Sequence, residues 1–163
     1  MKITKHILLM AFLATGLTAC NDDDDDYVPV GGEIINYNVT IGPNAWEYFE
    51  DDFGTVGVQT DFEVPDLTED IQEYGAVLVY LDYGNGVYEA LPQVYDDVSV
   101  LYNTFPYSLQ IQMTGINNIE IDPPGADVYC KIVMLEATVV EAHPNVDLQK
   151  MTLSEVERTF GVR

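Results

Sequence analysis

Apolar and polar residues alternate along three segments of the chain, at residues 33–41, 55–64 and 108–113. Successive side chains of a β-strand point to opposite faces, so the pattern predicts strands with one face in a core and the other toward water. The side chains predicted to face the core are Ile35, Tyr37, Val39, Ile41, Val56, Val58, Phe62, Val64, Leu109, Ile111 and Met113.

Two further segments are apolar on both faces and predict strands in the middle of a sheet. Residues 76–81 read AVLVYL, and residues 127–140 contain a run of four apolar residues from Ile132 to Leu135. Such a run is typical of a strand with neighbours on both sides. The sequence Gly84-Asn85-Gly86, which follows the first of these segments, predicts a hairpin turn.

The segment between residues 64 and 77 predicts a short helix. Asp66 is the predicted N-cap, and Glu69 three residues later completes the pattern of a capping box. We expect Ile71 and Tyr74 to face inward and Gly75 to end the helix.

A second helix is predicted near the C-terminus, where Leu153, Val156 and Phe160 recur at helical spacing. This helix would pack on the sheet as a lid. The order of elements predicts an all-β fold: an antiparallel β-sandwich, Ig-like or jelly-roll-like, with one short inserted helix and a short C-terminal helix. No linker interrupts residues 33–163, which we interpret as a single domain.

The first 19 residues have the pattern of an export signal. Lys2 and Lys5 precede an apolar run that ends at Leu17 and is shorter than the roughly 20 residues that span a bilayer. The following sequence, Leu17-Thr18-Ala19-Cys20, resembles the lipobox of bacterial lipoproteins. The resemblance implies cleavage between Ala19 and Cys20 and lipidation of the Cys20 sulfur, which would anchor the protein to a membrane. The alternative is an ordinary signal peptide with a chance cysteine at the cut.

An acidic run follows the cysteine, and it consists of Asp22, Asp23, Asp24, Asp25 and Asp26. Like charges repel one another, so residues 20–32 predict a solvated tether. An acidic run in this place also resembles the export signal of Bacteroidota surface lipoproteins. That resemblance implies attachment to the outer membrane, with the protein facing the cell exterior, and it is compatible with a tether.

The charge of the chain narrows the range of partners. It carries 28 acidic and six basic residues, a formal net charge of −22. Loss of Lys2 and Lys5 with the signal would leave −24. Nucleic acids and anionic lipid surfaces both require clustered Lys and Arg, so neither is an expected ligand. The charge would suit a cation or a basic ligand.

Candidate catalytic and metal-binding residues are few. His143 is the one histidine beyond the signal, and its polar surroundings predict an exposed loop. Cys130 alternates with apolar residues, which predicts a small buried side chain rather than a nucleophile. Residues 82–86, DYGNG, match a calcium loop only loosely and already predict a hairpin. We expect no catalytic residue, no metal site, no cofactor and no enzymatic activity.

Tyrosines are concentrated in the middle third of the chain, at Tyr83, Tyr88, Tyr95, Tyr102 and Tyr107. Exposed aromatic rings on one face would stack on sugar rings or anchor a partner protein. The alternative is that tyrosine suits strands, where the ring is buried and the hydroxyl group reaches water.

Residues 64–95 resemble a group of uncharacterised Bacteroidota surface lipoproteins. The shared features are a Val-Pro pair, a short helix, a Gly-x-Val-x-Val-Tyr strand and a hairpin that returns through Leu-Pro. The resemblance implies a surface β-domain and brings no catalytic residue with it. We therefore expect a lipid-anchored, non-catalytic binding or assembly component of the outer membrane, with a surface protein or glycan as its partner. The alternative is a carbohydrate-binding module that uses the exposed tyrosines.

Overall fold

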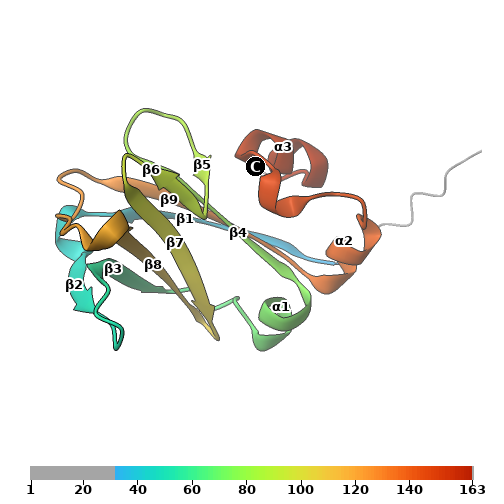
Figure 1. The fold of residues 1–163 in the computed structure, drawn as a ribbon. Helices are drawn as coiled ribbons and strands as arrows, with labels where there is room; N and C mark the ends of the chain where they lie inside the picture. Colours follow the sequence, from blue (N-terminus) through green and yellow to red (C-terminus); the bar gives the residue numbers. More distant parts are fainter. Residues whose placement is uncertain (1–31, 163) are drawn as a thin grey trace, which may run out of the picture.

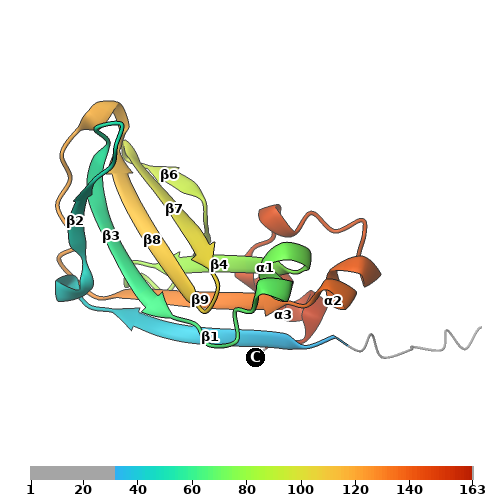
Figure 2. The same cartoon turned by 90° about the horizontal axis from the view of Figure 1, so that it is seen from below.

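A computed structural model describes residues 32–162. The predictions for Ala19, Cys20 and the run from Asp22 to Asp26 lie outside these residues. The described chain forms two antiparallel sheets that face each other (Figures 1 and 2), which confirms the predicted all-β sandwich.

The first sheet has four strands, in the order β1 (Ile34–Ile41), β9 (Val128–Leu135), β4 (Ala76–Asp82) and β5 (Glu89–Ala90). The second has five, in the order β2 (Glu47–Glu50), β3 (Val56–Glu63), β8 (Ser108–Gly115), β7 (Val98–Phe105) and β6 (Gln93–Tyr95). In Figure 2 the strands of the second sheet run steeply across those of the first. Both apolar runs form central strands, as predicted, since β9 lies between β1 and β4, and β4 lies between β9 and β5.

The main core lies between the two sheets. Its members include the alternating side chains predicted from the sequence, together with Val79, Leu81, Cys130 and Ile132 from the central strands. Val56 is the exception: it was predicted to face the core, but it lies at the start of β3 and lines a surface cleft instead. Ile111 and Ile132 are fully buried, one from each sheet. Burial of apolar side chains on this scale is the dominant stabilising term for a domain of this size.

A second core lies on the outer face of the first sheet. Tyr80 and Val133 point away from the main core and pack against Val139 of α2 (Ala137–Ala142) and Val156 of α3 (Leu153–Phe160). The C-terminal helix is therefore a lid on the sheet, as predicted. The outer face of the second sheet is not covered by any helix of the described chain (Figures 1 and 2).

The start of the first helix, α1 (Glu69–Tyr74), was wrongly predicted. Its N-cap is Thr68, whose hydroxyl oxygen accepts a hydrogen bond of 3.3 Å from the Ile71 backbone N–H, and Asp66 instead accepts a hydrogen bond from the Tyr37 hydroxyl. Ile71 is buried as expected, but Tyr74 is 60 % exposed because it ends the helix on the solvent side. Gly75 ends the helix, as predicted.

The prediction of one long strand over residues 127–140 was also wrong. Strand β9 ends at Leu135, and the next residues form α2, a third helix that the sequence pattern did not indicate. The Glu136 carboxylate accepts a hydrogen bond of 2.9 Å from the Glu33 backbone N–H, and its carbonyl accepts one from Val139. These two contacts turn the chain at Glu136, so that Val139 packs onto the sheet. Three 3₁₀ turns complete the fold, at Pro43–Ala45, Ile116–Asn118 and Leu148–Lys150.

Candidate functional site

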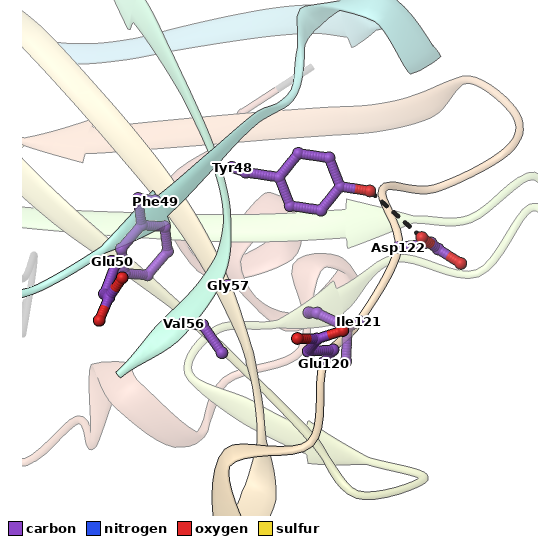
Figure 3. A pocket seen from close by; sticks show the side chains of 8 residues that line it. All are labelled: Tyr48, Phe49, Glu50, Val56, Gly57, Glu120, Ile121 and Asp122. Carbon is purple, nitrogen blue, oxygen red and sulfur yellow. Dashed lines mark hydrogen bonds between the residues drawn. The ribbon is translucent and has the colours of Figure 1, made fainter. Parts of the chain in front are cut away.

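A cleft of about 700 Å³ opens beside β2, the short edge strand of the second sheet (Figure 3). One wall is formed by β2 and the start of β3. The other is formed by the segment that leads toward β9. The residues that line it are Tyr48, Phe49, Glu50, Val56, Gly57, Glu120, Ile121 and Asp122. We call this the β2 cleft.

The turn between β2 and β3 fixes one side of the cleft. The Asp51 carboxylate accepts hydrogen bonds from the backbone N–H groups of Thr55, at 2.8 Å, and Phe53, at 2.9 Å. The hydrogen bond from Thr55 is the main reason that the pKa of Asp51 lies below its usual value. At the same turn Phe53 is 93 % exposed, so an apolar ring stands in water next to the cleft.

A missing side chain at Gly57 makes room for an aromatic ring. A Cβ atom added to Gly57 would collide with the Met113 backbone oxygen and would lie 2.9 Å from Cε1 of Phe49. The ring of Phe49 therefore lies against the bare backbone of β3. This position requires glycine because of the close approach and not because of its backbone angles.

A hydrogen bond joins the two walls of the cleft. The Tyr48 hydroxyl donates to Oδ1 of Asp122 at 3.2 Å, across 74 residues of sequence (Figure 3). The Tyr48 ring remains 68 % exposed. Loss of hydration and, second, this hydrogen bond to a carboxylate raise the pKa of Tyr48, so the phenol remains a proton donor at neutral pH.

The cleft is acidic. Glu50, Glu120 and Asp122 line it, and none of the eight lining residues is basic. Aromatic rings beside carboxylates attract organic cations, because the face of a ring is negative and the carboxylates add Coulomb attraction. A metal ion requires carboxylates that converge on one point. In residues 32–162 no group of three or more His, Cys, Asp or Glu side chains is placed to hold one.

A second surface of interest is the open outer face of the second sheet. Five polar side chains from β3, β8 and β7 form a continuous network there, with hydrogen bonds between 3.0 and 3.2 Å. The members of this network, which we call the amide ladder, are Gln59, Asp61, Asn103, Gln110 and Gln112. Phe105 of β7 lies at its end and is 47 % exposed.

The five tyrosines singled out in the sequence occupy different environments. The Tyr102 ring packs against the main core, and Tyr88 packs against the second core. Three others are exposed: Tyr83 in the β4–β5 hairpin by 41 %, Tyr95 at the end of β6 by 73 %, and Tyr107 in the β7–β8 turn by 55 %. The five tyrosines therefore do not form one surface, and a role for the three exposed ones in binding stays a prediction.

The loop with a loose calcium match forms the expected hairpin. β5 pairs with β4 in antiparallel register, with Glu89 opposite Leu81. Oδ1 of Asp82 accepts hydrogen bonds from the backbone N–H groups of Gly84, Asn85 and Gly86, at 2.8 to 3.0 Å. This carboxylate therefore organises the turn itself.

Two residues considered for catalysis have structural contacts. Cys130 is buried as predicted, and burial raises the pKa of its thiol to about 12. His143 lies in the loop that follows α2, as predicted, but it is half-buried and not exposed. Its Nδ1 lies 2.8 Å from the Val139 carbonyl oxygen, and its ring packs edge-on against Phe160 at 5.0 Å. Because a carbonyl only accepts, Nδ1 carries the proton.

Comparisons with protein-family models, with curated proteins and with solved structures found no match. Among residues 32–162, none of the helices has the length and apolar character needed to pass through a bilayer.

Neither the β2 cleft nor the amide ladder was predicted from the sequence. Tyr48 and Asp122 are far apart in the chain, so no local pattern connects them. The ladder left a weak signal, because Gln110 and Gln112 alternate with buried residues and so had to share the solvent face of a strand. The network forms only because three strands are neighbours in the sheet, and the sequence did not indicate this strand order.

Proposed function

We propose that the protein is a non-catalytic, lipid-anchored binding or assembly component of the outer membrane surface, and that the β2 cleft receives a cationic segment of a partner protein. The observation that carries the proposal is the combination of three carboxylates, no basic residue and an exposed Tyr48 ring in one cleft. A Lys or Arg side chain would place its charge beside Glu120 and Asp122 and its stem against the tyrosine ring.

The charge of the whole chain supports the same kind of partner. A net charge of −22 attracts a basic segment over a long range and repels acidic ones. The three cations of the described residues lie outside the cleft. Lys131 and Lys150 are in ion pairs with Glu157 and Asp147, and Arg158 is on α3. Nothing in the cleft lining therefore competes for the ligand.

A peptide-binding measurement on the intact lipoprotein in detergent micelles tests the cleft. The probe is a tetra-arginine peptide, and the variant is Glu120→Gln/Asp122→Asn, which removes two charges and few atoms. The control, Glu63→Gln/Glu73→Gln, removes the same charge from exposed positions away from the cleft. We expect affinity to fall about tenfold in the cleft variant only, since two charge-assisted contacts are lost. Equal losses in both variants would mean that net charge alone attracts the peptide.

The membrane anchor needs a separate experiment. Cys20→Ser removes the sulfur that would carry the lipid, so we expect the protein to leave the membrane fraction or to remain as an uncleaved precursor. Unchanged retention of a processed protein would contradict the anchor. Protease accessibility on intact cells then reports whether the domain faces the exterior.

A carbohydrate-binding module is the second candidate, and the amide ladder favours it. Side-chain amides and a carboxylate on an open sheet present both donors and acceptors, which sugar hydroxyls require, and Phe105 adds a ring for stacking. A glycan that binds the folded state must raise the melting temperature. The variant Gln110→Ala should abolish that rise, whereas Tyr95→Ala should abolish it only if the exposed tyrosines are the binding surface.

A further inference from the structure

Strand β1 presents a long unpaired edge. It is eight residues long, and within residues 32–162 its only partner is β9. The backbone N–H and C=O groups on its other side therefore have no strand to bind. Figure 2 shows β1 along the border of the first sheet, with no other strand beyond it. An open edge of this kind is a template for another strand.

The other edge strands of the two sheets are protected and β1 is not. β5 has two residues, β6 has three, and β2 has four, of which two are glutamates. Short length and charge are the usual devices that prevent pairing at an edge. β1, with the sequence IINYNVTI, has neither a charge nor a proline, although the chain contains 28 acidic residues.

We propose that β1 pairs antiparallel with β1 of a second copy of this chain, so that the two four-stranded sheets join into one. The sequence of β1 is self-complementary in the register that places Asn38 opposite Asn38 of the second copy. Asn36 then faces Thr40 of that copy, and Tyr37 faces its Val39. Polar residues meet on the outer face and apolar residues meet on the inner face, as the pleat requires.

The lack of charge on β1 makes this edge suitable for a second copy. Two chains with a net charge of −22 repel each other, and the repulsion is least where the contact itself carries no charge. On the inner side, the carboxylate of Asp66 is hydrogen-bonded to the Tyr37 hydroxyl. A basic segment from another protein would instead be drawn to the acidic β2 cleft. The inference goes beyond the proposed function and does not depend on it.

Disulfide cross-linking on cells that express the full chain tests the pairing and its register. Directly opposite residues of an antiparallel pair have Cα atoms roughly 4.5–5.5 Å apart, within the range that a disulfide spans. The variant Asn38→Cys should therefore give a covalent dimer under mild oxidation. Gln59→Cys, which is on the inner strand β3 of the second sheet, is the matched control and should remain a monomer. The native Cys130 is buried and does not contribute.

Two further variants check the register. Asn36→Cys and Thr40→Cys should each remain monomeric alone and should cross-link when the two are expressed together. The absence of a dimer with Asn38→Cys would overturn the proposal. A cross-linked product whose mass is not that of two chains would also overturn it, because a strand of a different protein would then occupy the edge. Asn38→Lys places two like charges opposite each other, and we therefore expect the dimer to be lost. A non-reducible cross-linker that does not react with amines would detect the loss. Circular dichroism should confirm that the variant is folded.

Discussion

The hydroxyl of Tyr102 donates a hydrogen bond of 2.7 Å to the backbone carbonyl of Val77, and this contact joins the two sheets. Tyr102 belongs to β7 of the second sheet, and Val77 belongs to β4 of the first. The ring fills space in the main core while the hydroxyl satisfies a carbonyl near the end of a central strand. Burial raises the pKa of Tyr102, which keeps the hydroxyl protonated as a donor.

Removal of this hydroxyl should destabilise the fold. Tyr102→Phe preserves the ring but leaves the Val77 carbonyl without its donor, and we expect a loss of roughly 1–2 kcal/mol in the free energy of unfolding. Urea unfolding monitored by circular dichroism measures the change. Tyr74→Phe removes a hydroxyl from a ring that is 60 % exposed, and it should leave stability unchanged. Equal effects in the two variants would contradict a specific role for the contact between the sheets.

Of the two ion pairs in the described residues, the one between Lys131 and Glu157 should contribute more to stability. Nζ of Lys131 lies 2.6 Å from Oε1 of Glu157, and the residue Lys131 is only 8 % exposed on the outer face of the central strand β9. Glu157→Ala leaves a buried ammonium group without a partner, and we expect a loss of roughly 1–3 kcal/mol. Glu141→Ala on the exposed side of α2 is the control and should change stability little. The melting temperatures of the two variants give the comparison.

The strand pattern could be read from the sequence because burial on one face imposes a period of two. The side chains Ile35, Val58 and Ile111 all face the main core, as their alternation indicated. The helix cap was misplaced by two residues because Asp66 and Thr68 are both good capping residues, and the tertiary contact of Asp66 with Tyr37 decided between them. Local preference alone does not contain that contact.

The missed helix α2 shows a second limit. Val139 and Val140 continue the apolar composition of β9, so composition alone favoured a longer strand. The break at Glu136 depends on the distant Glu33 backbone N–H. The same holds for the β2 cleft, whose two walls meet through Tyr48 and Asp122. Long-range contacts of this kind are set by topology. The sequence pattern specified β1, β3, β4, β8 and the start of β9, but it indicated neither β2, β6 and β7 nor the order of the strands.

The close packing at Gly57 makes a prediction about the cleft. Gly57→Ala introduces a Cβ that collides with the Met113 backbone oxygen and the Phe49 ring. Both groups belong to strands that flank β3 in the sheet, so neither has room to move away. We expect a loss of roughly 1–3 kcal/mol from overpacking, measured by urea unfolding. Gly125→Ala has open space around its Cβ and should be neutral or slightly stabilising. A harmless Gly57→Ala would show that β3 can shift away from both Met113 of β8 and Phe49 of β2.

Cys130 should be unreactive in the folded protein. Its side chain is buried between the sheets, and a pKa of about 12 in place of 9.0 lowers the thiolate fraction about a thousandfold at neutral pH. We expect no alkylation by iodoacetamide at pH 8 under native conditions and complete alkylation in 6 M guanidinium chloride, with the modified peptide identified by mass. Rapid native labelling would mean that the sheets separate often enough to expose the core.

The same thiol should make the fold sensitive to alkali. The pKa of Cys130 is higher in the folded state than the 9.0 expected for an unfolded chain, so the folded state holds the proton more tightly. Its contribution to stability is fully present below pH 9 and is lost as the pH rises from about 9 toward 12. We expect the free energy of unfolding to fall over this range and to fall less steeply in Cys130→Ala. The slopes of the two proteins are compared, and their absolute stabilities are not. Tyr80, with a pKa raised by burial to about 12, and Tyr102, whose pKa burial also raises, remain in both proteins and contribute to the residual slope. Identical slopes between pH 9 and 11 would show that the thiol keeps its ordinary pKa and that water reaches the centre of the sandwich.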